Sequence, residues 1–229
     1  MRILFTTWSF PGHINPTVAL ARALAERGHQ VAFSTGERAR AAIERQGFPL
    51  YTFQHLDEES VYATVFSPIS RSKMSRATVL KDWMLKTLPD QVKDQQAALA
   101  DWKADVVVSD VTMWGTPLVL HELTGVPCVI CSFAPGCMIP SPDVPPWGLG
   151  LPSPRTWWTR LLCRTARLLT EKYVAGFRRA GNEMRARFGL APLSIPVHEY
   201  LAGMPLYLVP SVPELDYNRA GLPPSVHYI

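Results

Sequence analysis

Short apolar runs alternate with segments of helical period over the first part of the chain. Runs rich in valine, isoleucine and other apolar residues predict buried strands at 2–7, 30–34, 49–53, 105–109 and 126–131. Between them, apolar residues recur every three or four positions and predict helices at 16–27, 37–46, 76–102 and 114–124. This alternation is typical of an α/β fold, in which helices flank a Rossmann-like parallel β-sheet.

Capping residues predict the bounds of the first helix, and periodicity and composition predict the nature of two further segments. Asn15 is predicted to cap the helix with Pro16 at its first position, and Gly28 ends it. The excursion 54–75 lacks a clean period and is predicted to be irregular. The segment 132–154 is rich in proline and glycine but also carries apolar residues, which predicts a long ordered loop. A long helix at 155–188 and strands at 204–209 and 225–229 complete the prediction.

Composition excludes several classes of protein. Apolar residues make up 47% and charged residues 18% of the 229, so neither a disordered chain nor a charge-rich coiled coil is expected. The apolar stretch after Met1 is too short for a signal peptide, and 126–140 is too short for a membrane helix. We therefore expect a cytoplasmic protein.

The net charge of +4 is unevenly distributed. Segment 155–187 holds nine basic residues and only Glu171 and Glu183 as acidic ones, with Trp157 and Trp158 at its start. The pattern favours a helix whose arginines are solvated, with peripheral membrane contact through 155–178 as the alternative. No nucleic-acid partner is expected, because the segment offers no basic groove with several stacking rings.

The spacing of Cys128 and Cys131 allows a metal-binding or redox interpretation. Both cysteines lie in a strand pattern rich in valine and isoleucine, where a free cysteine acts as a small buried apolar residue. The sequence therefore predicts no metal site. A dinucleotide site is also disfavoured, because the loop after the first strand has Gly12 in place of a G-x-G-x-x-G motif.

Two polar residues are predicted at the carboxyl edge of the sheet, where α/β proteins bind ligands. His13 lies in the loop after the first strand, and Asp110 follows the strand at 105–109. A histidine held by a carboxylate can act as a general base towards a hydroxyl. From position alone, each residue could equally be a surface residue or a helix cap.

Two motifs carry a resemblance to a known family. Segment 10–31, FPGHINPTVALARALAERGHQV, follows the pattern G-H-x-N-P-x-x-x-L-A-x-x-L-x-x-R-G-H-x-V. A second match comprises Val108, Ser109 and Asp110, then Trp114 and the segment 125–127. These motifs resemble the amino-terminal half of UDP-glycosyltransferases and macrolide glycosyltransferases of the GT-B fold.

The resemblance implies a mechanism and a set of partners. By it, His13 deprotonates an acceptor hydroxyl, Asp110 holds His13, and the sugar is transferred with inversion and without a metal. Gly12 and Asn15 are expected near the donor, a nucleotide-diphosphate sugar (UDP- or dTDP-sugar) that this chain does not bind as a cofactor. That donor requires a carboxy-terminal nucleotide-sugar-binding domain in cis or trans, which the sequence lacks.

The resemblance also implies one acceptor-binding domain over 1–229, with 54–75 and 132–188 adapted to the acceptor. Apolar residues in these segments favour a hydrophobic hydroxylated small molecule. A non-catalytic small-molecule or lipid-binding module on the same scaffold is the alternative. The expected acceptor residues are Phe10, Phe66, Met74, Trp114, Phe133, Met138, Ile139 and Trp147.

Overall fold

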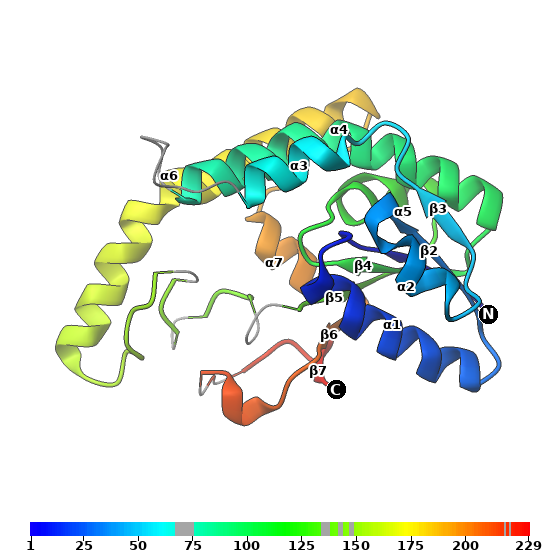
Figure 1. The fold of residues 1–229 in the computed structure, drawn as a ribbon. Coiled ribbons are helices and arrows are strands. Elements are labelled where there is room, and N and C mark those ends of the chain that lie inside the picture. Colours follow the sequence, from blue (N-terminus) through cyan, green and yellow to red (C-terminus); the bar gives the residue numbers. More distant parts are fainter. Residues whose placement is uncertain (67–75, 134–137, 142–143, 147–148, 218, 220) are drawn as a thin grey trace. The chain divides into compact units, whose positions relative to one another are not determined.

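The structure is a computed structural model, and it describes residues 1–66, 76–133, 138–141, 144–146, 149–217, 219 and 221–229. The chain divides into two compact units, Met1–Val129 and Ile130–Ile229. Figure 1 shows the helices and strands in chain order.

The strands form a sheet with the order β3-β2-β1-β4-β5-β6-β7. Every strand pair with a described register is parallel. The predicted α/β class with a Rossmann-like parallel sheet is therefore confirmed. The strands are β1 Arg2–Thr6, β2 Gln30–Thr35, β3 Leu50–Thr52, β4 Val106–Asp110, β5 Cys128–Cys131, β6 Leu206–Val209 and β7 Val226–Tyr228.

In the first unit, helices cover both faces of the strands (Figure 1). Helices α1 and α2 connect successive strands towards one edge, and α4 carries the chain back to β4, so right-handed crossovers put α4 on the opposite face. The helical elements are α1 Pro11–Glu26, the 3₁₀ turn η1 Glu37–Ala39, α2 Arg40–Glu44, α3 Glu58–Val65, α4 Arg76–Trp102, the π-helical turn η3 Thr116–Leu120 and α5 His121–Thr124.

The direction of the strand order reverses between β1 and β4. Strand β1 pairs with β2 on one side and with β4 on the other, with Thr6 opposite Ser109. Crossovers leave the sheet in opposite directions here, and α/β proteins bind ligands at such a reversal of the strand order. The loop after β1 leads to His13, and Asp110 is the last residue of β4.

The second unit holds the end of β5, the strands β6 and β7, and two helices. Helix α6, Trp157–Arg187, begins with a capping box between Thr156 and Thr159. Helix α7, Val197–Ala202, packs on α6, and the Phe177 and His198 rings meet edge to face 6.3 Å apart. The short helix α7 and the 3₁₀ turn η4, Pro213–Leu215, were not predicted.

The start of α1 corrects one prediction. The helix begins at Pro11 rather than Pro16, and Phe10 takes the place assigned to Asn15 as the cap. The Phe10 carbonyl accepts hydrogen bonds from the backbone of His13 (2.8 Å) and Ile14 (2.9 Å), which forms the first turn. Pro11 suits this first position because its missing N–H has no partner there in any helix. His13 is therefore a first-turn helical residue and does not lie in a loop.

The excursion 54–75 also differs from its prediction. Residues 58–65 form α3, capped by Asp57, whose side chain accepts the backbone N–H of Ser60 at 3.0 Å. Its sequence shows no clear helical period, because a helix of 8 residues in which Val61 is the residue classed as buried gives too few repeats of the apolar pattern. The predicted helix at 114–124 likewise becomes the π-helical turn η3 followed by α5.

A buried carboxylate holds the start of this excursion against α4. The Asp94 side chain on α4 accepts backbone N–H groups from Gln54, His55 and Leu56, each at 3.0 Å. Buried backbone donors need a partner, and one carboxylate supplies it for three consecutive residues. This contact fixes the chain that enters α3.

We predict that Asp94→Ala lowers the free energy of unfolding by about 3 kcal/mol, because three donors lose their charged acceptor. Urea denaturation followed by circular dichroism measures the change. Asp90→Ala, one turn earlier on α4 and paired with Lys93 at the surface, is the control and should cost less than about 1 kcal/mol. Equal effects of the two substitutions would show that the carboxylate of Asp94 is not a structural anchor.

Candidate active site

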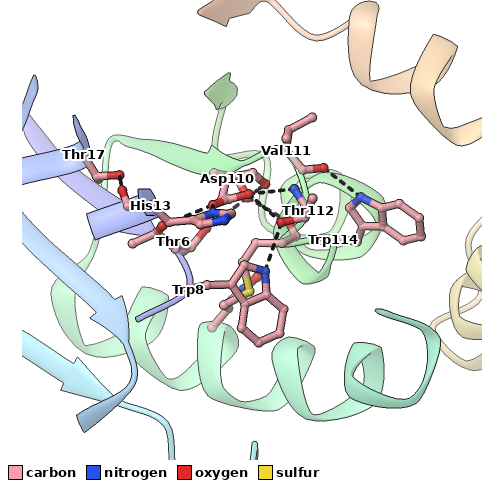
Figure 2. Close-up of polar contacts among 12 residues, drawn as sticks. Thr6, Trp8, His13, Thr17, Asp110, Val111, Thr112 and Trp114 are labelled. Atoms are coloured by element: carbon pink, nitrogen blue, oxygen red, sulfur yellow. Dashed lines mark hydrogen bonds and ion pairs between the residues drawn. The ribbon is translucent and has the colours of Figure 1, made fainter. Parts of the chain in front are cut away.

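The side chains of His13 and Asp110 are hydrogen-bonded to each other in the first unit (Figure 2). The Nδ1–H of His13 donates to Oδ2 of Asp110. The Asp110 side chain is fully buried, whereas that of His13 is 28% exposed. The pair therefore has an inner carboxylate and an imidazole that reaches the surface.

Three further donors complete the coordination of Asp110. The Thr7 hydroxyl donates to Oδ2 at 3.3 Å, and Thr112 donates to Oδ1 from its backbone N–H (2.8 Å) and its hydroxyl (2.7 Å). The Trp8 indole N–H donates to the Thr112 hydroxyl oxygen at 3.1 Å. Both carboxylate oxygens are thus satisfied, which fixes the side chain that orients His13.

Opposing effects set the pKa of His13. Burial lowers its pKa by disfavouring the charged form, but the hydrogen bond and the negative charge of Asp110 raise it more, so the pKa lies above 6.5. Because the Nδ1–H donates a hydrogen bond to Asp110, the neutral tautomer has its lone pair on Nε2. The arrangement can therefore take a proton at Nε2 and stabilise the imidazolium that results.

Helix α3 holds the loop that leads to His13. The Glu58 carboxylate accepts a close hydrogen bond from the Ser9 hydroxyl, and the Tyr62 hydroxyl donates to the Ser9 carbonyl at 3.1 Å. A Cβ at residue 36 would overlap Glu58 Oε1, so a side chain there would displace the Glu58 carboxylate from its present position. These contacts fix Ser9 immediately before the first turn of α1.

An aromatic cluster lies beside His13. The Phe10 ring meets the His13 ring edge to face at 5.6 Å, and the Phe66 ring meets Phe10 in the same way at 5.4 Å. Phe10 is buried, whereas Phe66 is 61% exposed. The rings of Trp8, Tyr62 and Trp83 also contact Phe10. The exposed Phe66 ring is therefore linked to His13 through the buried Phe10 ring.

The other predicted site residues lie in different environments. Trp114 is buried, and its indole N–H donates to the Val111 carbonyl at 2.9 Å. Gly12 and Asn15 are exposed in the first turns of α1. In the second unit, Met138 and Ile139 are buried and Phe133 is partly buried. Met74 and Trp147 lie outside the described residues, so the assignment of this set to an acceptor site stays a prediction.

Sequence reasoning missed the residues that support Asp110. Thr112 could have been found, because Asp-x-Thr is a pattern in which the aspartate accepts the backbone N–H two residues on. No local signal indicates Thr7 or Glu58, since their partners lie 103 and 49 residues away in sequence. They depend on the packing of distant segments.

Cys128 and Cys131 are buried in β5 and form no disulfide, and burial raises the pKa of the Cys128 thiol. Among the described residues, no group of three or more histidine, cysteine or acidic side chains could hold a metal ion.

Comparison with known proteins identifies the family to which the chain is similar. Residues 10–138 match the family described as the glycosyltransferase family 28 N-terminal domain. The 4'-demethylrebeccamycin synthase of Lentzea aerocolonigenes is 31% identical over 237 residues, which cover 100% of this chain and 55% of that protein.

Solved structures share the fold at lower identity. The glycosyltransferase SsfS6 of Streptomyces sp. SF2575 has a TM-score of 0.59 and 16% identity, over 100% of this chain and 53% of that one. The spinosyn rhamnosyltransferase SpnG in complex with spinosyn aglycone has a TM-score of 0.59 and 18% identity, over 100% and 50%. The chain thus spans about half the length of these relatives.

We predict that the pKa of His13 in the folded chain exceeds 6.5, and that Asp110→Asn lowers it below that value, because burial then acts without the carboxylate charge. NMR titration of the histidine ring protons measures both. An unchanged far-UV circular dichroism spectrum of Asp110→Asn is the control that the fold is retained. If Asp110→Asn left the pKa of His13 unchanged, the proposed effect of the Asp110 carboxylate on that pKa would be contradicted.

Proposed function

The chain belongs to the glycosyltransferase family 28 N-terminal domain family, and on that premise we propose that it is the acceptor-binding, base-carrying half of a sugar transferase. The main support for this proposal is the hydrogen bond between His13 and the fully buried Asp110 at the point where the strand order reverses. This pair has the chemistry of a general base and its orienting acid. The proposal covers the whole protein of which this half would form a part.

In the proposed reaction, Nε2 of His13 takes the proton of an acceptor hydroxyl. The acceptor oxygen forms a bond to the anomeric carbon of the donor sugar as the bond from that carbon to the nucleotide diphosphate breaks. The bonding electron pair leaves with the diphosphate oxygen. Attack from the face opposite the leaving group inverts the configuration, and Asp110 stabilises the imidazolium.

The donor is proposed to be a nucleotide-diphosphate sugar held by a carboxy-terminal domain, in cis or in trans. A solved structure of SpnG contains thymidine diphosphate, and the present chain corresponds to 49% of that protein. We also propose that transfer requires no metal, because a helix amino terminus in the donor domain would stabilise the diphosphate. The prediction that follows for this half alone is weak or no affinity for the donor.

The acceptor is proposed to be a hydrophobic hydroxylated small molecule. The exposed Phe66 ring is continuous with Phe10, and Phe10 is continuous with His13, so an apolar body on these rings would bring a hydroxyl towards the base. Burying apolar surface there would contribute about 25 cal/mol per Å². A relative solved with spinosyn aglycone supports the same class of acceptor.

We predict that His13→Ala lowers turnover by about 100-fold or more, because a positioned base contributes roughly 10²–10⁴. The assay joins this chain to the carboxy-terminal part of the Lentzea aerocolonigenes relative and follows release of the nucleoside diphosphate with and without EDTA. Asp110→Asn should lower turnover less than His13→Ala.

The pH profile of the same assay separates base catalysis from a structural role. Asp110 raises the pKa of His13 above 6.5. As the pH is lowered through that pKa, the imidazole becomes protonated, and wild-type kcat/KM should fall. Asp110→Asn should move that acidic limb to lower pH. Full activity of His13→Ala, or an unchanged limb in Asp110→Asn, would refute the base assignment.

We predict that the isolated chain binds hydrophobic hydroxylated compounds weakly, and that Phe66→Ala raises the dissociation constant about tenfold by removing the exposed ring. Isothermal titration calorimetry with a panel of polyketide, sterol and small polar alcohols measures the constants. Leu123→Ala, which truncates an exposed apolar residue on α5, is the matched control and should have no effect. Binding of small polar alcohols alone would overturn the acceptor class.

A further inference from the structure

Three sectors of different chemistry run along the first half of α6, residues 157–170. One sector is buried: Thr159, Cys163 and Ala166 face the segment before the helix, and the Cys163 thiol donates to the Pro152 carbonyl at 3.6 Å. The Arg167 guanidinium donates to the carbonyls of Ser141 and Val144. These contacts join one side of the helix to the preceding segment. The other sides of this half of the helix do not take part in them.

The second sector is apolar and exposed. Trp157 and Leu169, at its two ends, are each 78% exposed. At 100° per residue its positions fall within one arc of about 140°, and they extend roughly 18 Å along the helix. The members of this sector are Trp157, Trp158, Leu161, Leu162, Leu168 and Leu169.

The third sector is basic and borders the apolar one. Arg160 and Arg164 are exposed and lie in the arc between the buried and the apolar sectors, and Arg155 is exposed just before the helix. No aspartate or glutamate occurs in the sequence from 155 to 170. An anionic surface could therefore approach this half of the helix without meeting a negative charge.

We propose that the first half of α6 docks on an anionic lipid bilayer, with its axis in the plane of the interface. The apolar sector would enter the boundary between headgroups and acyl chains, which favours tryptophan and leucine. The arginines beside it would reach the lipid phosphates. No helix among the described residues is long and apolar enough to cross a membrane, so the contact is peripheral.

The charges argue against a second copy of this chain as the occupant. A symmetric contact through the apolar sector would bring the arginines of two copies close together, with no acidic residue from 155 to 170 to offset them. A bilayer of anionic lipid supplies the opposite charge along the whole length of the sector. The proposal stands independently of sugar transfer.

Vesicle flotation with the 229-residue chain tests the proposal. The chain should float with vesicles of phosphatidylcholine and phosphatidylglycerol, should bind phosphatidylcholine alone much less, and should be released at high ionic strength. Arg160→Gln with Arg164→Gln should lower partitioning into the anionic vesicles by roughly tenfold or more. Trp157→Ala with Leu169→Ala should lower it by about as much.

Two matched double variants control for charge and apolarity. Arg22→Gln with Arg45→Gln removes the same charge from exposed positions of the first unit, and Val212→Ala with Leu215→Ala removes exposed apolar groups around η4. Both should partition like the wild type. Circular dichroism and the thermal midpoint establish that all four variants fold.

Three results would overturn the proposal. The first is no flotation with anionic vesicles, and the second is equal flotation with phosphatidylcholine alone. The third is a concentration-dependent dimer in analytical ultracentrifugation that Trp157→Ala with Leu169→Ala abolishes, which would identify a second copy as the occupant. None of these results depends on whether His13 acts as a base.

Discussion

The buried charge of Asp110 is the constraint from which the site is built. A carboxylate removed from water is costly unless its oxygens are hydrogen-bonded, and here four donors reach it from two segments. Thr7 and His13 follow β1, whereas Thr112 follows β4. The charge therefore ties together the two loops that diverge at the reversal of the strand order, where the backbone alone would leave them apart.

The same constraint explains the properties of His13. Its place in the first turn of α1 puts it at the positive end of the helix dipole, which disfavours an imidazolium. Burial acts in the same direction, yet Asp110 outweighs burial and the pKa is raised. A histidine placed at a helix start thus depends on its carboxylate for a raised pKa. Desolvation, by contrast, lowers the pKa of the partly buried His198.

The strands and the long helices could be predicted from sequence because their signals are local. The valine run of β4 and the 27 residues of α4 appear within one or two residues of their predicted bounds. Pairing of His13 with Asp110 could be anticipated from topology, since both follow parallel strands and such strands end at one edge. The start of α1 was misplaced because Asn15-Pro16 is a stronger local signal than Phe10-Pro11, and only the contacts of the Phe10 carbonyl decide between them.

Polar contacts between side chains and partners far away in sequence could not be predicted, because they depend on the packing of distant segments. Thr7, Glu58 and Asp94 are unremarkable in sequence, and each acquires its role from a partner at least 38 residues away.

The His13 ring contacts Asp110 and Phe10, and both residues lie within the first unit, Met1–Val129. These contacts orient the imidazole within that unit. Preorganised polar groups need no rearrangement during a reaction, which is how fixed dipoles and charges lower a barrier. Under the proposed function, the peripheral segments of such a half could be adapted to new acceptors, since changes there leave Asp110 and its four donors in place.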